Sequence, residues 1–234
     1  MKSKTLLITL AVIAAAAIAG YFLFPFAFTV APIAEVEQVK QSEAFDPVAY
    51  VNGIWQNQVL PAFTEKAVDL PTVLNALNPG PDGTAPKDSL IPVAKQYGLI
   101  TVGEAHVYRV KGSGTITAVD TSKSTGTMEV KLDGYDGSII VKLYIGPRIP
   151  SDESSVRDAV GFITFGDFKE QTEYGKVAAE LNKRVNAEVL TPLNKDSLVG
   201  KQISFLGAMN IRTFNLVSIN LKQVNIVPVQ IEVK

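Results

Sequence analysis

The order in which hydrophobic periodicities follow one another constrains the fold of this chain more than any other feature. Three segments are strand-like, namely 106–119, 128–132 and 139–145. The second and third alternate apolar and polar residues with the period of two that is typical of half-buried strands. A stretch with helical spacing, 151–190, comes next, and strand-like segments at 202–211 and 217–233 end the chain. The sequence therefore predicts three strands, a helical insertion and two more strands.

That order is typical of the five-stranded OB fold, in which a helix lies between the third and fourth strands. Gly112 and Gly114 interrupt the first segment, where we expect the bulge or sharp bend of a barrel corner. We predict an α+β chain, mainly β, with an OB-fold-like barrel at 105–234. A small helical unit and an N-terminal membrane helix are expected to precede the barrel.

The N-terminal segment is apolar and long enough to cross a membrane. Residues Thr5 to Ala34 include no charged side chain, and about twenty helical residues span a bilayer's hydrocarbon layer. Lys2 and Lys4 place the N-terminus in the cytoplasm by the positive-inside rule. We interpret 1–34 as an uncleaved signal anchor of a single-pass inner-membrane protein whose remaining residues lie in the periplasm or another extracytoplasmic space. Cleavage near Ala17-Ile18-Ala19, which would give a soluble periplasmic protein, is the alternative.

Residues 35–104 are interpreted as a polar linker followed by a small helical unit. Asp46 directly precedes Pro47, and Asp69 stands two residues before Pro71; both arrangements are typical of a capped helix start. Trp55 lies on the apolar stripe of the first helix, which Pro61 should kink or end.

Composition excludes several kinds of chemistry. The chain has no Cys and one His, so disulfides, zinc–thiolate centres and a multi-His metal site cannot form within it, and a catalytic triad would have to use His106. Lys and Arg total 22 against 23 Asp and Glu, which lacks the basic excess of a nucleic-acid-binding protein. We expect a protein without catalytic residues, metal, cofactor or nucleic-acid partner.

Several short motifs follow one another along residues 44–234. They are Phe45-Asp46-Pro47, Tyr50-Val51-Asn52-Gly53-Ile54-Trp55, Leu60-Pro61, Lys66-Ala67-Val68-Asp69-Leu70-Pro71, Tyr97-Gly98, Val110-Lys111-Gly112-Ser113-Gly114, Ile145-Gly146-Pro147, Val156-Arg157-Asp158-Ala159, Phe162-Ile163-Thr164-Phe165-Gly166-Asp167-Phe168 and Glu180-Leu181-Asn182. In this order they resemble the predicted periplasmic lipoproteins of unknown function that are often encoded beside bacterial sugar ABC importers.

The resemblance implies an exported, membrane-attached accessory protein. The family usually carries a lipidated Cys, and we expect the membrane helix to substitute for it here. Our hypothesis is a non-enzymatic binding protein that assists a sugar ABC importer, with transporter subunits or a solute-binding protein as partners and a binding surface on the first three strands. The alternative is a structural envelope module that docks through residues 44–98 and binds no small ligand. The sequence leaves the oligomeric state open.

Two arginines are candidate ligand-binding residues, because a guanidinium can hold a carboxylate or phosphate through two hydrogen bonds. Arg148 follows the third predicted strand, and Arg157 lies early in the helical stretch beside Asp158. The alternative for Arg157 is a structural pairing with Asp158, Asp167 or a backbone carbonyl.

Aromatic side chains are the other candidates. Phe165 and Phe168, with Phe162 before them and Asp167 between them, could form a floor for a sugar ring, or a core stripe at helical spacing. Trp55 is either a stacking platform for a sugar or an anchor of the helical unit on the barrel, and Asn182 either binds a hydroxyl or has a capping or surface role.

Overall fold

Strand pairing organises the part of the chain that the structure describes, residues 13, 18–19 and 45–234 of the computed structural model. The predicted signal anchor, its alternative cleavage site and the linker fall on residues 1–44, which lie outside that part except for 13, 18 and 19. Among the described residues, no helix has both the length and the apolar character needed to cross a membrane.

Five strands form a closed cycle of hydrogen-bonded pairs. They are β4 (His106–Asp120), β5 (Thr127–Leu132), β6 (Ile140–Tyr144), β7 (Gln202–Ile211) and β9 (Gln223–Val233). Their order is β4-β5-β6-β9-β7 and back to β4. The β6–β9 pair is parallel and the other four pairs are antiparallel. The mixed α+β architecture agrees with the prediction.

Helical segments connect β6 to β7, as predicted for the third and fourth strands, but they are not one continuous stretch. They are α7 (Ser155–Val160), the 3-10 turn η2 (Phe165–Asp167), α8 (Gln171–Val185) and the π-helical turn η3 (Asn186–Leu190). Gly161 ends α7 because it takes the left-handed conformation, with φ of 79°. The predicted helix over 151–190 is therefore wrong at its start and in its middle.

Short elements precede and flank the cycle. They are α3 (Pro47–Ile54), the π-helical turn η1 (Trp55–Val59), α4 (Leu60–Lys66), β1 (Val68–Asp69), α5 (Leu70–Leu77), β2 (Thr84–Pro86), α6 (Lys87–Tyr97), β3 (Leu99–Ile100) and β8 (Ser218–Asn220). Strands β1 and β3 pair with β4, and β2 pairs with β8.

Of the helix starts and ends predicted in this region, the cap by Asp46 is confirmed, whereas a side-chain cap by Asp69 and a helix end at Pro61 are wrong. Asp46 caps α3, because its Oδ1 accepts the N–H groups of Val48 and Ala49 at 2.9 and 3.1 Å. Asp69 makes no such cap and instead lies 3.7 Å from Nζ of Lys111. Pro61 does not end its helix. It follows η1 in the first turn of α4, so its missing N–H falls beside a turn that already departs from α-helical bonding.

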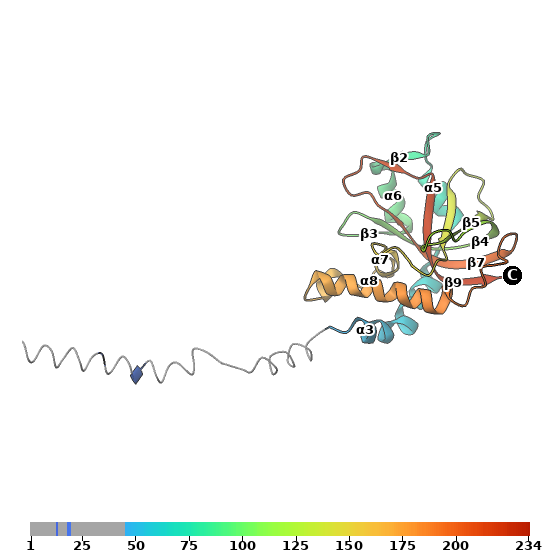
Figure 1. Cartoon of the computed structure of the whole chain (residues 1–234). Coiled ribbons are helices and arrows are strands. Elements are labelled where there is room, and N and C mark those ends of the chain that lie inside the picture. Colours follow the sequence, from blue (N-terminus) through green and yellow to red (C-terminus); the bar gives the residue numbers. More distant parts are fainter. Residues whose placement is uncertain (1–12, 14–17, 20–44) are drawn as a thin grey trace, which may run out of the picture. The chain divides into compact units, whose positions relative to one another are not determined.

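Two layers of apolar side chains hold residues 46–234 together as one compact unit. The inner layer joins helices α5 and α6 to the strand cycle, and it includes Leu74, Leu90, Leu143 and Ile226. A second layer includes Trp55, Phe63, Val156 and Leu181 from the remaining helices, all buried. In Figure 1, α3 and α8 lie side by side. The predicted division into units 35–104 and 105–234 stays a prediction. Helices α5 and α6, which precede residue 104, share a hydrophobic core with the strands that follow it.

Glycines of β4 are needed for close packing and not for the bulge that the sequence suggested. The register shift between β4 and β5 lies between Ile116 and Ala118. A Cβ added to Gly112 would come within 2.9 Å of Leu132 and Phe205 inside the cycle. A Cβ on Gly114 would collide with the carbonyl oxygen of Lys131 and lie 2.8 Å from Val130.

Gly114→Ala should therefore lower the free energy of unfolding by about 1–3 kcal/mol, the usual cost of overpacking a well-packed site. Urea unfolding of the two proteins measures the change. Gly175→Ala is the matched control, because nothing lies within 4 Å of a Cβ there and the residue is in the middle of α8. It should raise stability by about 0.5–1 kcal/mol. Equal effects of the two substitutions would contradict this account of β4.

Candidate functional site

Arg157 is held inside the protein by several partners. Its Nε and Nη2 lie 2.8 and 2.7 Å from Oδ1 of Asp158, and its Nη1 donates to the carbonyl of Tyr174 at 3.0 Å. The guanidinium also stacks 3.5 Å from the centre of the Tyr174 ring. Asp158 accepts further hydrogen bonds from the hydroxyls of Tyr174 and Ser154. These contacts fix α7 on α8 and favour the structural interpretation of Arg157 and Asp158.

Phe165 and Phe168 lie around the same tyrosine. Their ring centres are 5.8 and 5.7 Å from that of Tyr174. The alternative of a core stripe is wrong for Phe165, which is 51% exposed, because 161–170 is not a continuous helix. Asp167 is engaged locally, since its carboxylate accepts the N–H of Thr164 and caps η2.

The other predicted residues have separate positions. The Trp55 side chain is buried and its Nε1 donates to Oε2 of Glu188 at 2.7 Å, so its ring face cannot take a sugar. Arg148 is exposed in the loop after β6. Asn182 donates from Nδ2 to the carbonyl of Glu153 at 2.7 Å. It thereby joins α8 to the loop that precedes α7.

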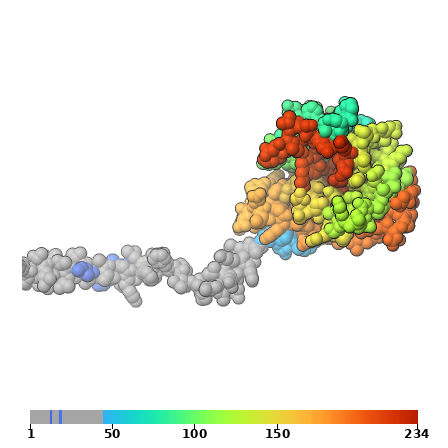
Figure 2. Space-filling view, turned by 45° about the horizontal axis from the view of Figure 1, so that its top comes forward, coloured from blue at the N-terminus to red at the C-terminus, as the bar shows by residue number. Residues whose placement is uncertain are grey.

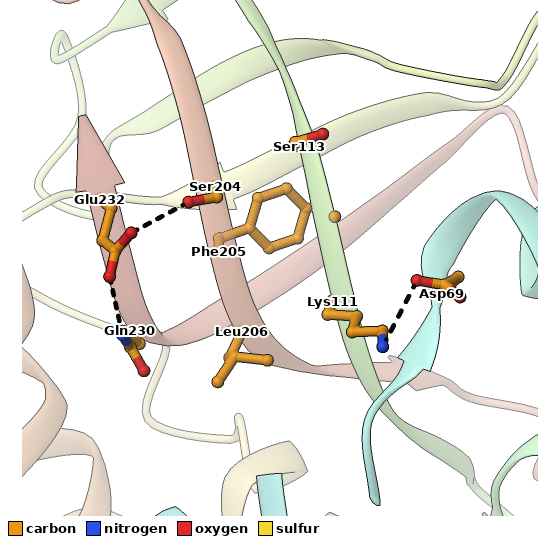
Figure 3. Close-up of a pocket in the computed structure, with 9 residues that line it drawn as sticks. Asp69, Lys111, Ser113, Ser204, Phe205, Leu206, Gln230 and Glu232 are labelled. Carbon is orange, nitrogen blue, oxygen red and sulfur yellow. Dashed lines mark hydrogen bonds and ion pairs between the residues drawn. The ribbon is translucent and has the colours of Figure 1, made fainter. Parts of the chain in front are cut away.

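A groove crosses the outer face of β4, β7 and β9 (Figure 3), with a volume of about 370 Å³. Lys111 pairs with Asp69 on one side, and Glu232 accepts hydrogen bonds from Ser204 and Gln230 on the other. Leu206 lies between the two sides. The charged groups of this groove are exposed and already have partners, because Lys111 pairs with Asp69 and Glu232 accepts from two neutral side chains. The groove therefore gives no strong indication of a ligand.

A second hollow, which we call the Glu153 cleft, is larger at about 470 Å³. It lies between the loop before α7 and the ends of β6, β7 and β9. Its residues are Tyr144, Pro150, Asp152, Glu153, Asn210, Ile211, Arg212, Leu216, Ile219, Asn220, Leu221, Gln223, Val224 and Asn225. Side-chain amides, two carboxylates, a guanidinium and aliphatic groups therefore meet in one place.

Glu153 is the unusual member of this set. Only 8% of the residue is exposed, and its side chain makes a single hydrogen bond among the described residues, from the N–H of Ser155 to Oε1 at 2.9 Å. Asn210 also has a buried Oδ1 that accepts no hydrogen bond from the described part of the chain. Buried acceptors are ordinarily satisfied, so the oxygen of Asn210 leaves room for a donor. The second carboxylate oxygen of Glu153, which accepts no hydrogen bond from the described residues, is also open to one.

The other charges of the cleft are paired. Arg212 donates from Nη1 to Oδ2 of Asp152 at 2.8 Å and from Nη2 to its carbonyl at 3.0 Å. The hydrogen bond between the two side chains lowers the pKa of the Asp152 carboxyl group and raises the pKa of the Arg212 guanidinium. Burial, and next the charge of Glu153, raise the pKa of Tyr144, so its hydroxyl keeps its proton at neutral pH and can donate. The cleft thus offers both donors and acceptors.

Sequence reasoning missed this cleft. Glu153 stands in the polar run 151–155, which has the composition of a surface loop, and no periodicity marks it. Tyr144 and Asn210 lie on strands that also pair with segments distant in sequence, β6 with β9 and β7 with β4. The one usable signal was Asn182, a candidate residue that contacts the Glu153 backbone.

A family model of predicted periplasmic lipoproteins (DUF2291) matches residues 11–232. The chain belongs to this family of predicted periplasmic lipoproteins. The family inferred from the motifs is therefore confirmed, and its description as periplasmic indicates a location outside the cytoplasm. An association with sugar importers is not part of that description. The family's description names no activity or ligand.

Solved structures support the fold of this predicted periplasmic lipoprotein. It is similar to a crystal structure of an OB-fold protein from Thermotoga maritima, with a TM-score of 0.59 and 20% sequence identity. The similarity covers 82% of this chain and 100% of the other. At this identity the comparison supports the fold alone. No functionally curated protein matches the chain.

Removing the Arg157 side chain should destabilise the protein strongly. The Arg157–Asp158 pair is 10% and 7% exposed at its side chains, and breaking a buried pair typically costs about 3–5 kcal/mol. We expect Arg157→Ala to lower the free energy of unfolding by about 3 kcal/mol, as measured in urea. Arg184→Ala is the control, because its pair with Glu188 is 27% and 38% exposed and should be worth below about 1 kcal/mol. A similar loss in both variants would argue against the structural role of Arg157.

Proposed function

We propose that this chain is an exported, membrane-anchored and non-enzymatic binding protein that assists a bacterial sugar ABC importer by holding a small hydroxyl-rich ligand in the Glu153 cleft. The observation that carries the proposal is the buried Glu153 carboxylate, which has one hydrogen bond and lines an open cleft. Its spare acceptor capacity calls for a ligand that donates hydrogen bonds.

Hydroxyl groups suit the rest of the cleft because each one can donate and accept. They would donate to Glu153 and accept from the amides of Gln223 and Asn225 at the cleft wall. The aliphatic side chains of Leu216 and Ile219 would contact the C–H groups of such a ligand. A cleft of this volume is within the usual range for small-molecule sites.

The family and the N-terminal sequence support the proposed location and membrane attachment of the protein. The family is described as periplasmic, which supports a location of the proposed binding site outside the cytoplasm. The uncharged segment Thr5 to Ala34 supports a membrane anchor, with a cleaved signal as the alternative. The association with a sugar importer, through transporter subunits or a solute-binding protein, rests on the motif resemblance.

The test is isothermal titration of the full chain, in mild detergent, against a panel of monosaccharides and polyols. We expect at least one member to bind, and Glu153→Gln to weaken it by about tenfold or more, the value of one charge-assisted hydrogen bond. Gln can still accept the N–H of Ser155, so the variant should remain folded.

Glu232→Gln is the matched control, because it removes an equal charge from the groove of Figure 3. It should leave the affinity unchanged. Failure of the whole panel to bind, or equal weakening by the two substitutions, would contradict the proposal.

A second candidate function is protein–protein interaction, which is favoured by exposed apolar side chains on two neighbouring loops. This apolar loop patch comprises Ile100, Val102, Phe214, Leu216 and Val217. Val102 is 100% exposed, Val217 86% and Phe214 63%. The loops are joined by a hydrogen bond from the Thr213 hydroxyl to the Glu104 carbonyl. Figure 2 shows the red connection between β7 and β9 lying against β2, with which β8 pairs.

Apolar groups this exposed are typical of interaction sites. They lie outside the helical unit 44–98 that the sequence suggested as the docking surface.

If the apolar loop patch binds a partner protein, Phe214→Ser with Val217→Ser should remove partner subunits that co-purify from native membranes, as measured by mass spectrometry. Val199→Ser is the control, since Val199 is 61% exposed elsewhere. Unchanged co-purification in the double variant would exclude the patch.

A further inference from the structure

Arg109, on β4, is a half-buried arginine for which the described part of the chain supplies no ion-pair partner. Three other arginines, Arg157, Arg184 and Arg212, each pair with a carboxylate. The Nη1 of Arg109 donates to the backbone carbonyls of Ala159 and Val160, and its buried Nε has no hydrogen-bond partner. Burial lowers the pKa of this guanidinium. A partly buried cation without a counter-charge is unusual, because burial of an unpaired charge is costly.

The contacts of Nη1 have a structural explanation, since a cation at the C-terminus of α7 satisfies its last carbonyls. They use one of the three nitrogens of the guanidinium, which carries five N–H donors in all. Within the described residues, Nε and Nη2 make no hydrogen bond, and no carboxylate pairs with the positive charge of Arg109.

Arg109 lines a cleft of about 570 Å³ that is separate from the Glu153 cleft and from the groove of Figure 3. Its walls come from η1 and α4 on one side and from β3 and the end of α7 on the other. Lys66 brings a second cation and Glu65 an exposed acid, while Asn57 and Gln58 bring amides. Leu99 and the exposed ring of Phe162 supply apolar wall.

The π-helical turn η1 contributes to this site directly. It carries Asn57 and Gln58, and its last bond runs from the N–H of Leu60 to the carbonyl of Trp55. Single π turns inside α-helices occur frequently at functional sites. The turn is thus a second observation, independent of the charge on Arg109, that points to the same cleft.

We propose that the Arg109 cleft is a binding site for a small organic anion, a carboxylate with an apolar or aromatic body. The carboxylate pairs with the guanidinium of Arg109, Lys66 adds attraction at the rim, and the body of the ligand lies against Phe162 and Leu99. This site is distinct from the one on which the proposed sugar-related function rests.

The probes are benzoate and benzamide, which have the same shape and differ in charge. Isothermal titration of the full chain in mild detergent should show binding of benzoate and at least about tenfold weaker binding of benzamide, the loss of one charge-assisted hydrogen bond. Benzoate affinity should also fall as salt is raised, since part of the attraction is electrostatic. Equal binding of the two probes, or no binding of benzoate, would overturn the proposal.

Variants locate the site. Arg109→Gln should weaken the affinity for benzoate by about tenfold or more, whereas Arg148→Gln, which removes an exposed arginine elsewhere, should leave this affinity unchanged.

If Arg109→Gln fails to fold, Asn57→Asp serves instead. It is isosteric, lies at an exposed position, and places a carboxylate in the cleft that competes with the probe. Its benzoate affinity should fall by about tenfold, and its melting temperature should not. Unchanged benzoate affinity in Asn57→Asp, or equal losses in the two arginine variants, would refute the assignment.

Discussion

Strand β4 is the constraint on which the rest of this structure depends. Its 15 residues pair with β7 along the first part and with β5 along the second, and this double pairing closes the cycle of five strands. Gly114 lies where the pairing with β5 begins, and a side chain there would collide with that strand. The same strand supplies Lys111 to the groove of Figure 3 and Arg109 to the cleft beside α4.

The segment between β6 and β7 contributes one wall of the Glu153 cleft. The loop before α7 reaches the ends of β6, β7 and β9, and the contact of Asn182 with the Glu153 backbone holds it there. Arg157, Asp158 and Tyr174 lock α7 to α8 on the same insertion. Three of the residues predicted from sequence as ligand contacts, Arg157, Asp158 and Asn182, thus help to position the loop that carries Glu153.

The element order could be predicted because alternation of apolar residues, as at Met128, Val130 and Leu132, directly reflects one buried face of a strand. Asp46 was also predictable, since capping is a local interaction. The break at Gly161 was missed because helical spacing continues across it. The burial of Glu153 with a single hydrogen bond, and the missing counter-charge of Arg109, depend on contacts between distant segments, which no local pattern records. The anchor proposed for residues 1–34 remains a prediction from hydropathy.

We propose that the Glu153 cleft is the site at which this protein binds a small hydroxyl-rich ligand. Hydrogen exchange of the full chain, measured by mass spectrometry with and without a saturating mixture of monosaccharides, tests it most directly. The account predicts slower exchange in 144–154 and 210–225, the segments that form the cleft. Protection confined to 111–113 and 202–206, around the groove of Figure 3, or no protection in either region, would contradict it.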